Sequence, residues 1–312
     1  MALITIESSP TALKNGTRPS EETAREYCRH LELGDILFIP GIPFDIANDD
    51  LKFLLQQRQT GGAFHKNVAY RTNEDRLTGF AGGHPGDAER TRAIMRAYSQ
   101  SATKLLSVLL APYKERWKLD YASYRPLEED GRDLSLHKRN DLLHTDAFPS
   151  RPTNGDRILR FFTNINPTVP RKWMTTSPFD ALAGQFAGKS GGCPLPKPLH
   201  GSALLNAVRG IRQTARSIGI PITVRSPYDE FMLRFHNFLK ENGDFQKNCP
   251  KDYWDFPPNS CWMVYTDMTS HAVLSGQYAL EQTYIVSREA MVTPEKAPVR
   301  ILEKMVGAPL VS

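Results

Sequence analysis

The chain has 312 residues, of which 40% are hydrophobic, and carries 39 Lys and Arg against 34 Asp and Glu, a formal net charge of +5. This length allows one large domain with a substantial core, and so modest a charge does not by itself indicate a nucleic-acid partner. No stretch reaches the roughly 20 apolar residues of a membrane-spanning helix, and the first residues lack the pattern of a secretory signal. We therefore expect a cytoplasmic protein whose four cysteines, which show no CxxC spacing, are free thiols.

The first third of the chain predicts helices around a short strand. Residues 1–18 contain turn formers without periodicity and predict a loose arm. Ser20 is a helix-capping residue followed by acidic residues, which predicts a helix to about Leu33. Further predicted elements are a strand at 36–39, a short helix at 49–57, a long loop over the functional site at 59–86, and the longest helix at 88–117, whose apolar residues recur at helical spacing and should pack behind a sheet.

The remainder of the chain is rich in predicted strands, at 121–124, 134–136, 157–165, 222–225, 261–265, 271–275 and 278–286. Two helices are predicted between them, at 204–218 and 228–241. Together the elements predict an α+β fold with a mainly β core, a double-stranded β-helix or cupin-like jelly roll with flanking helices and a long insertion. We expect one catalytic domain over 19–312, with a helical elaboration at 19–118, a β core at 119–167 and 255–290, and a lid-like insertion at 168–254.

The most informative residues are His144 and Asp146, which lie just before a predicted strand, and His271, which opens a predicted hairpin far downstream. Side chains two residues apart point to the same side of an extended strand. Two imidazoles and one carboxylate that leave other positions open form the facial triad of non-haem Fe(II) oxygenases. The sequence therefore predicts a metal site at these three residues, although the same residues could be a surface pair and a core histidine.

An Fe(II) site of this kind usually binds 2-oxoglutarate, which chelates the metal at one end while its other carboxylate meets a buried cation. Many such proteins have that cation shortly after the third ligand, where this chain has Glu281 instead. We predict that Arg160 takes the role, because alternation places it on an inward strand face and Arg suits bidentate carboxylate binding. Arg157, on the opposite face, should form a salt bridge or meet substrate. Additional cosubstrate contacts are predicted from Asn164, Gln282 and Thr283.

Positive charge is concentrated around the predicted metal site. Between residues 131 and 172 the chain has eight Lys and Arg against four Asp, a net excess of +4. A solvated basic face is the commoner explanation of such a run, but beside a metal it indicates an anionic cosubstrate or substrate. No acid–base residue beyond the metal triad is predicted, because the cofactor supplies the oxidising chemistry.

Three blocks of the sequence, residues 61–70, 144–167 and 270–283, resemble the Kdo hydroxylase family. The block HTDAFPSRPTNGDRILRFFTNINP at 144–167 is the most specific, and the resemblance extends from about Leu33 to Val286. It implies an Fe(II)/2-oxoglutarate-dependent dioxygenase of Gram-negative bacteria. Such an enzyme hydroxylates C3 of a 3-deoxy-D-manno-octulosonic acid (Kdo) residue in Kdo-lipid A, part of the lipopolysaccharide inner core, and releases succinate and CO2.

The implied substrate is anionic, because Kdo carries a carboxylate and lipid A carries phosphates. The resemblance further implies O2 as co-reactant, no nucleic-acid partner, and peripheral contact with the cytoplasmic face of the inner membrane. Candidate substrate-binding residues are Lys66, Arg71, Lys138, Arg139 and Arg151.

Two other functions fit the same residues. A 2-oxoglutarate-dependent hydroxylase of protein or nucleic acid would share the metal and the cosubstrate, and would turn over peptides or bind DNA or RNA in a salt-sensitive way. A jelly-roll carbohydrate-binding module would keep His144, Asp146 and His271 as structural residues or as ligands of a passive metal, and would consume no 2-oxoglutarate.

Overall fold

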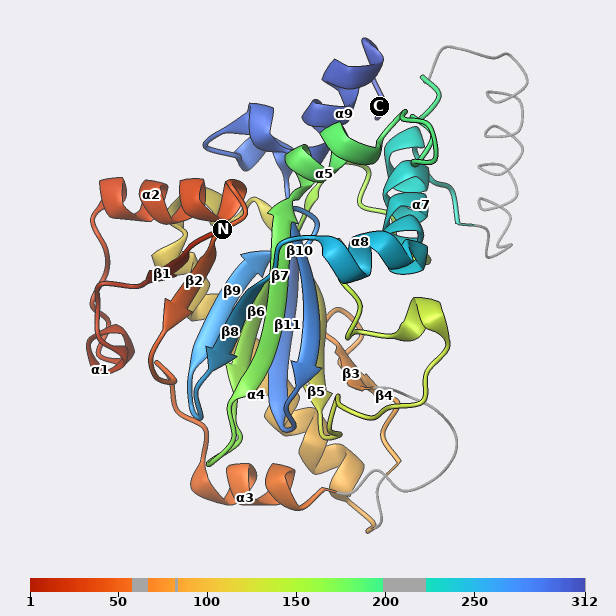
Figure 1. The fold of residues 1–312 in the computed structure, drawn as a ribbon. Coiled ribbons are helices and arrows are strands. Elements are labelled where there is room, and N and C mark those ends of the chain that lie inside the picture. The colour runs from red at the N-terminus through yellow and green to blue at the C-terminus, as the bar shows by residue number, and fades with distance from the viewer. Residues whose placement is uncertain (58–66, 82–83, 199–222, 312) are drawn as a thin grey trace, which may run out of the picture.

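The computed structural model describes residues 1–57, 67–81, 84–198 and 223–311, and its ribbon is drawn in Figure 1. Among these residues the strands form two sheets. The larger sheet has the order β1 (Leu3–Thr5), β2 (Ile36–Ile39), β9 (Cys261–Tyr265), β6 (Arg157–Asn164), β11 (Ala279–Val286), β5 (Trp117–Arg125), β3 (Val68–Arg71) and β4 (Arg76–Thr78). The smaller sheet has the order β10 (Thr269–Ser275), β7 (Arg171–Pro178) and β8 (Asp252–Phe256).

The pairings between these strands are antiparallel, except that β1 pairs with β2 in parallel. Two antiparallel sheets that face one another across an apolar interior form a jelly-roll core. The predicted α+β class with a jelly-roll core is confirmed.

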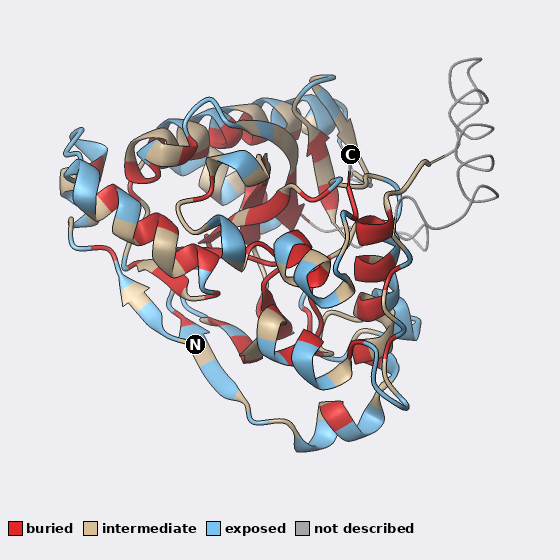
Figure 2. Ribbon diagram, turned by 90° about the horizontal axis from the view of Figure 1, so that it is seen from above, coloured by how far each residue is buried: buried red, intermediate tan, exposed pale blue. Residues whose placement is uncertain are grey.

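Helices surround the strands, as Figure 1 shows. The α-helices of the described residues are α1 (Pro10–Lys14), α2 (Glu21–Glu32), α3 (Asn48–Gln56), α4 (Asp87–Leu109), α5 (Phe179–Phe186), α7 (Pro227–Glu241), α8 (Gly243–Asn248) and α9 (Pro298–Val306), and the 3-10 helices are η1 (Ala111–Tyr113), η2 (Leu136–Lys138), η3 (Arg288–Ala290) and η4 (Pro294–Lys296). Buried residues lie along the strands and on the inward sides of the helices (Figure 2). None of these helices has the length and apolarity needed to cross a bilayer.

Successive side chains of β6 point to opposite faces of the larger sheet, and each face packs in its own hydrophobic core. Phe161 lies in the main core, on the face of the sheet that α4 covers, and the hydroxyl of Tyr98 on α4 donates to the Phe161 carbonyl over 3.4 Å. Helix α4 therefore packs behind the sheet as predicted. Phe162 points into the interior, where it stacks on Trp262 and meets Trp173 of the smaller sheet edge-on. This aromatic cluster joins the two sheets, and its register places Arg160 on the same interior face.

Two helices begin as their sequences dictate. The Ser20 hydroxyl accepts the Thr23 amide at the start of α2, as its sequence predicted. Helix α7 has a capping box, in which Ser226 accepts the Asp229 amide and the Asp229 carboxylate accepts the Ser226 amide. This second cap fixes the entry of the helix that lies beside the predicted metal ligands.

Several expected boundaries are corrected. Residues 1–18 are not a loose arm, because β1 adds a strand to the larger sheet and α1 follows it. Strands β3 and β4 lie inside the expected loop at 59–86. Residues 134–136 form no strand and lead into η2, and residues 223–225 are not a strand either. The predicted helix at 228–241 is confirmed as α7, and the one at 204–218 lies outside the described residues.

The expected insertion at 168–254 contains part of the β core. Strand β7 pairs with β10 and β8, so the smaller sheet is built from both ends of that segment. Most of β7 is buried on both faces, and it therefore lacks the alternation of polar and apolar residues by which a half-buried strand is recognised.

The buried ion pair of Arg157 with Asp267 supports a stability prediction. Arg157 Nε donates to Asp267 over 2.8 Å, and its guanidinium lies 4.2 Å from the centre of the Tyr265 ring. Arg157→Met leaves a fully buried carboxylate unpaired and should lower the free energy of unfolding by about 3–5 kcal/mol in denaturant titrations. Adding Asp267→Asn to Arg157→Met should recover part of this loss. The control is Lys14→Met, which breaks an exposed ion pair with Asp45 and should lower the free energy of unfolding by no more than about 0.5 kcal/mol. Equal losses in Arg157→Met and Lys14→Met would contradict the prediction.

Candidate metal centre

The backbone brings His144, Asp146 and His271 together. His144 and His271 form an isolated antiparallel bridge, with N–H to carbonyl distances of 3.1 Å and 2.9 Å in the two directions. Their ring centres are 4.8 Å apart as a result. The Asp146 amide donates to the Thr266 carbonyl over 2.7 Å, and one Asp146 carboxylate oxygen lies 3.7 Å from Nε2 of His144. A ladder between distant segments therefore positions the three residues that the sequence predicted as ligands.

Backbone carbonyls fix the protonation of both imidazoles. Nδ1 of His144 is 2.6 Å from the Leu142 carbonyl oxygen, and Nδ1 of His271 is 2.9 Å from that of Thr269. A carbonyl can only accept, so each Nδ1 carries the proton and each Nε2 has a free lone pair. Metal-binding histidines are oriented in this way in proteins.

Burial and charge keep these groups in the forms that bind metals. Burial lowers the pKa of His144 well below its ordinary value, with the neighbouring His271 lowering it further, so the imidazole is neutral at pH 7. Burial acts to raise the pKa of Asp146, but the positive charge of Arg160 more than offsets this and holds the pKa well below its usual range. An ionised carboxylate beside neutral imidazoles is a suitable donor set for Fe(II) or another divalent transition metal.

A further imidazole, which the sequence did not predict, lies in the same cluster. His236 on α7 has its ring centre 4.8 Å from that of His144, and potential ligand atoms of His144, Asp146 and His236 lie within 4.8 Å of one another. Its Nδ1 is 2.8 Å from the Thr145 carbonyl oxygen. Burial and the nearby Lys240 lower the pKa of His236 to about 4. A signal existed in the sequence, since His236 and Lys240 continue a helical stripe of buried residues at spacings of four.

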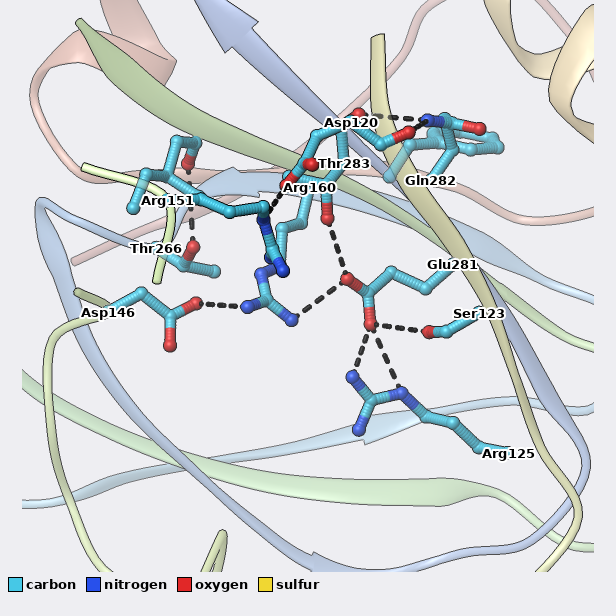
Figure 3. A network of polar contacts seen from close by, with 12 residues as sticks. Asp120, Ser123, Arg125, Asp146, Arg151, Arg160, Thr266, Glu281, Gln282 and Thr283 are labelled. Atoms are coloured by element: carbon cyan, nitrogen blue, oxygen red, sulfur yellow. Dashed lines mark hydrogen bonds and ion pairs between the residues drawn. The ribbon is translucent and has the colours of Figure 1, made fainter. Parts of the chain in front are cut away.

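Arg160 connects this cluster to a buried network of charges. Its guanidinium lies 2.9 Å from Asp146 and 2.8 Å from Glu281, and Figure 3 shows it between the two carboxylates. Asp146 thus presents one oxygen to His144 and the other to Arg160. Glu281 accepts in addition from Arg125 and from Ser123, the latter over 3.2 Å. Arg160 therefore fixes the Asp146 carboxylate, the group expected to bind the metal, through the oxygen that does not face His144.

The network continues into the interior with alternating signs. Arg125 lies 3.5 Å from Glu129, which lies 3.0 Å from Arg171. Arg160 and Arg125 hold the pKa of Glu281 down to about 2 against the opposing effect of burial. Arg171, the innermost member, has its pKa lowered by burial to about 10. Each buried charge is compensated by a neighbour of opposite sign.

The predicted cosubstrate residues do not all meet. Thr283 donates to Glu281 over 3.0 Å and so lies beside Arg160. Alternation along β11 turns Gln282 to the opposite face, where its amide binds the Asp120 and Thr283 carbonyls over 3.3 Å and 2.8 Å. Asn164 shares the inward face but its amide binds the carbonyls of Val169, Phe256 and Pro257, which ties together two turns. The described contacts thus bring Thr283, and neither Gln282 nor Asn164, to Arg160.

Two of the predicted substrate residues, Arg71 and Arg151, form with the rings of Tyr121 and Phe148 a chain of contacts that leads to Arg160. We call this chain of contacts the arginine ladder. Arg71 lies 5.2 Å and Arg151 4.0 Å from the centre of the Tyr121 ring. Arg151 and Arg160 in turn lie 4.5 Å and 5.6 Å from the centre of the Phe148 ring. The side chains of Arg71 and Arg151 are about one-third exposed, and that of Arg160 is 15% exposed. The ladder therefore runs from the surface toward the metal cluster.

The other predicted substrate residues lie apart from this ladder. Arg139 pairs with Asp141 over 3.0 Å and lines a surface cavity of about 270 Å³ together with Arg132 and several acidic residues. Lys138 is exposed at the end of η2. Lys66 lies outside the described residues.

A jelly roll with a buried cluster of imidazoles and a carboxylate belongs to the class of cupin-like metalloproteins. Residues 14–309 match the family model described as 3-deoxy-D-manno-oct-2-ulosonic acid (Kdo) hydroxylase. The chain therefore belongs to the Kdo hydroxylase family, as its sequence predicted.

Solved structures agree with this assignment. The Kdo hydroxylase KdoO in complex with α-ketoglutarate and Fe(III) is 32% identical, with a TM-score of 0.82 over 100% of this chain and 98% of that one. KdoO in complex with cobalt(II) is 33% identical, with a TM-score of 0.83 over 99% and 97% of the two chains. A search of curated proteins found no match.

A metal-binding prediction follows from the donor set. Co(II) at one hundred times its dissociation constant should stabilise the folded protein by about 2.7 kcal/mol and raise its melting temperature. Asp146→Asn and His144→Ala should abolish this shift, because each removes a ligand. His30→Ala, which removes an imidazole paired with Asp35, serves as the control and should keep the shift. An unchanged shift in His144→Ala would exclude the cluster as the metal site.

A pH prediction follows from Glu281. In the unfolded chain the Glu281 carboxylate has the ordinary pKa of 4.5, whereas in the folded protein its pKa is about 2. The ion pairs of Glu281 thus contribute up to about 3 kcal/mol above pH 4.5, and this contribution is lost as the pH falls toward 2. Glu281→Gln should therefore be less stable than wild type at pH 7, with a difference that narrows below pH 4.5 in urea titrations. A stability difference between the two proteins that stays constant with pH would contradict the lowered pKa of Glu281.

Proposed function

We propose that the protein is an Fe(II)/2-oxoglutarate-dependent dioxygenase that hydroxylates C3 of a Kdo residue in Kdo-lipid A and releases succinate and CO2. The observation that carries the proposal is the convergence of His144, Asp146 and His271 inside the jelly roll of a Kdo hydroxylase family member. KdoO, the similar protein, is described as a non-haem Fe(II) α-ketoglutarate-dependent dioxygenase and has been solved with α-ketoglutarate and with succinate.

In this proposal His144, Asp146 and His271 hold the Fe(II). When bound, Fe(II) and 2-oxoglutarate together supply the oxidising chemistry that inserts one oxygen atom of O2 into a C–H bond. The residues of the chain supply orientation. The carbonyls of Leu142 and Thr269 aim the two imidazoles, and Arg160 holds the outer oxygen of Asp146 so that the inner oxygen faces the metal position.

Arg160 is the proposed anchor of the cosubstrate carboxylate. Its Nε is buried and has no protein acceptor among the described residues, so a donor remains for an anion. Thr283 lies beside it but donates its hydroxyl hydrogen to Glu281, and Glu281 must share Arg160 with the bound carboxylate. Asn164 and Gln282 are bound to backbone carbonyls, which supports a structural role for both.

The arginine ladder is the proposed contact surface for the anionic sugar and its lipid. Arg71 and Arg151 are partly exposed and lie over the Tyr121 ring, which limits the positions that their guanidinium groups can take. A carboxylate or phosphate group on the substrate matches this geometry better than a neutral sugar does. Lys66, Lys138 and Arg139 remain weaker candidates for the same substrate.

We further propose that the protein works in the cytoplasm and meets its lipid substrate at the inner face of the inner membrane without inserting a helix. The support is the net charge of +5, together with the absence of a bilayer-spanning helix in the parts of the chain described. Anionic lipid surfaces attract basic proteins electrostatically.

The test is succinate formation from 2-oxoglutarate by anaerobically iron-loaded protein, with and without Kdo-lipid A, with product mass measured in parallel. We expect succinate in equal amount to a sugar that has gained one oxygen atom, and no product from His144→Ala. Turnover of a peptide or an oligonucleotide in place of Kdo-lipid A would replace the substrate assignment. No iron-dependent turnover with any of these acceptors would refute the proposal.

The two arginine roles can be separated kinetically. Arg160→Met should raise the KM for 2-oxoglutarate by about tenfold to a hundredfold, since a charge-assisted hydrogen bond is worth about 1.5–3 kcal/mol. Arg71→Met should instead raise the KM for Kdo-lipid A and leave that for 2-oxoglutarate unchanged. The reverse pattern would exchange the two assignments, and no change in either variant would exclude both.

A further inference from the structure

Three of the four tryptophans of the chain lie in the aromatic cluster that joins the two sheets. Trp173 of β7 and Trp262 of β9 are buried in it with their ring centres 5.7 Å apart, and Trp254 of β8 packs against the cluster. The Trp173 ring also stacks on that of His271, at a centre-to-centre distance of 5.2 Å and an angle of 21°. Indole gives up an electron more readily than phenylalanine or imidazole rings do. The cluster therefore places an oxidisable ring directly against a proposed metal ligand.

The two buried indoles lack hydrogen bonds. Nε1 of Trp173 and Nε1 of Trp262 are buried and have no acceptor among the described residues. A buried indole N–H usually has a partner, because leaving it unpaired costs free energy. Phenylalanine would fill an apolar core without this cost, and it does so nearby at Phe162 and Phe256. The two unpaired indoles therefore indicate a role beyond packing, and electron transfer is one that phenylalanine cannot take.

Trp254 connects the buried indoles with solvent. In the register of the smaller sheet it lies directly opposite Trp173, so the two side chains are neighbours on one face of that sheet. Strand β8 is the last strand of the smaller sheet, and Trp254 is half-buried. Its Nε1 donates to Oγ1 of Thr175 over 2.7 Å, which fixes the ring beside β7. A continuous series of rings thus runs from His271 through Trp173 to Trp254.

We infer that Trp173 and Trp254 form an electron relay that protects the metal site when 2-oxoglutarate and O2 react with no sugar bound. This inference rests on the proposed function. Without a sugar C–H bond to oxidise, the reaction needs two electrons and two protons from elsewhere, and it then yields succinate, CO2 and water. Trp173 supplies each electron through the stacked ring of His271, and Trp254 returns one electron to Trp173 each time. The protons come from water.

A small reductant in solution, such as ascorbate, restores Trp254 and is itself oxidised by two electrons. When no reductant is present, Trp254 is the final electron source. Its indole loses two electrons and two protons and gains the oxygen of one water molecule, so a C–H bond is replaced by C–OH. The water consumed at Trp254 balances the water formed at the metal site. Trp254 is modified in preference to Trp173 because Trp173 is only 1% exposed and water does not reach it.

The test is the position of oxidised tryptophan after iron-loaded protein has turned over 2-oxoglutarate and O2 without sugar, mapped by peptide mass spectrometry and divided by the succinate formed. We expect Trp254 to gain the mass of one oxygen atom, and ascorbate to prevent this gain while succinate continues to form. Trp117 is the internal control, because it is also half-buried but packs on Tyr284 outside the aromatic cluster, and it should stay unmodified. Zn(II)-loaded protein should show no modification, since zinc has no redox chemistry.

Trp173→Phe separates the relay from attack by a diffusible oxidant. The variant keeps an aromatic ring against His271 but removes the oxidisable one, so the oxidation of Trp254 per succinate should be lost. Undiminished oxidation of Trp254 in this variant would overturn the relay. Equal oxidation of Trp254 and Trp117 in the wild-type protein would also overturn it, and that comparison holds even if the variant fails to fold. Succinate formation with no oxidised Trp254 would overturn the relay alone, whereas no iron-dependent succinate at all would refute the proposed function as well.

Discussion

The ion pair between Arg160 and Asp146 is the interaction on which the rest of the site depends. Arg160 comes from the interior face of β6, and its other partner, Glu281, comes from the neighbouring strand β11. The strand register therefore orients the Arg160 guanidinium, and this guanidinium orients the Asp146 carboxylate that we propose as a metal ligand. A slip of one residue in β6 would turn Arg160 out of the interior and leave Asp146 without its counter-ion.

The same interaction explains how so many charges can be buried together. Asp146, Arg160, Glu281, Arg125 and Glu129 alternate in sign from the metal cluster into the interior. Removing one member leaves a neighbour uncompensated, which costs far more than an exposed pair contributes. In the proposed complex, an anionic cosubstrate on Arg160 would enter this network at its outer end, where a divalent cation on Asp146 would balance the added charge.

Local patterns in the sequence predicted much of the site. The spacing of His144 and Asp146 predicted a shared side, and alternation predicted the inward face of Arg160. Of the two roles expected of Arg157, a salt bridge or a contact with substrate, the structure shows the salt bridge, and the family resemblance is confirmed. What failed depends on contacts distant in sequence. Strand β7 shows no alternation because it is buried between two partners, and His236 reaches the cluster only through the docking of α7.

Oxygen labelling tests the central claim most directly. The iron-loaded protein would be supplied with 2-oxoglutarate, Kdo-lipid A and dioxygen labelled with the heavy isotope, and both products analysed by mass spectrometry. A dioxygenase built on this site should place one labelled atom in the new hydroxyl group at C3 of Kdo and the other in succinate. A hydroxylated sugar carrying only oxygen from water, or labelled succinate with an unmodified sugar, would contradict the account.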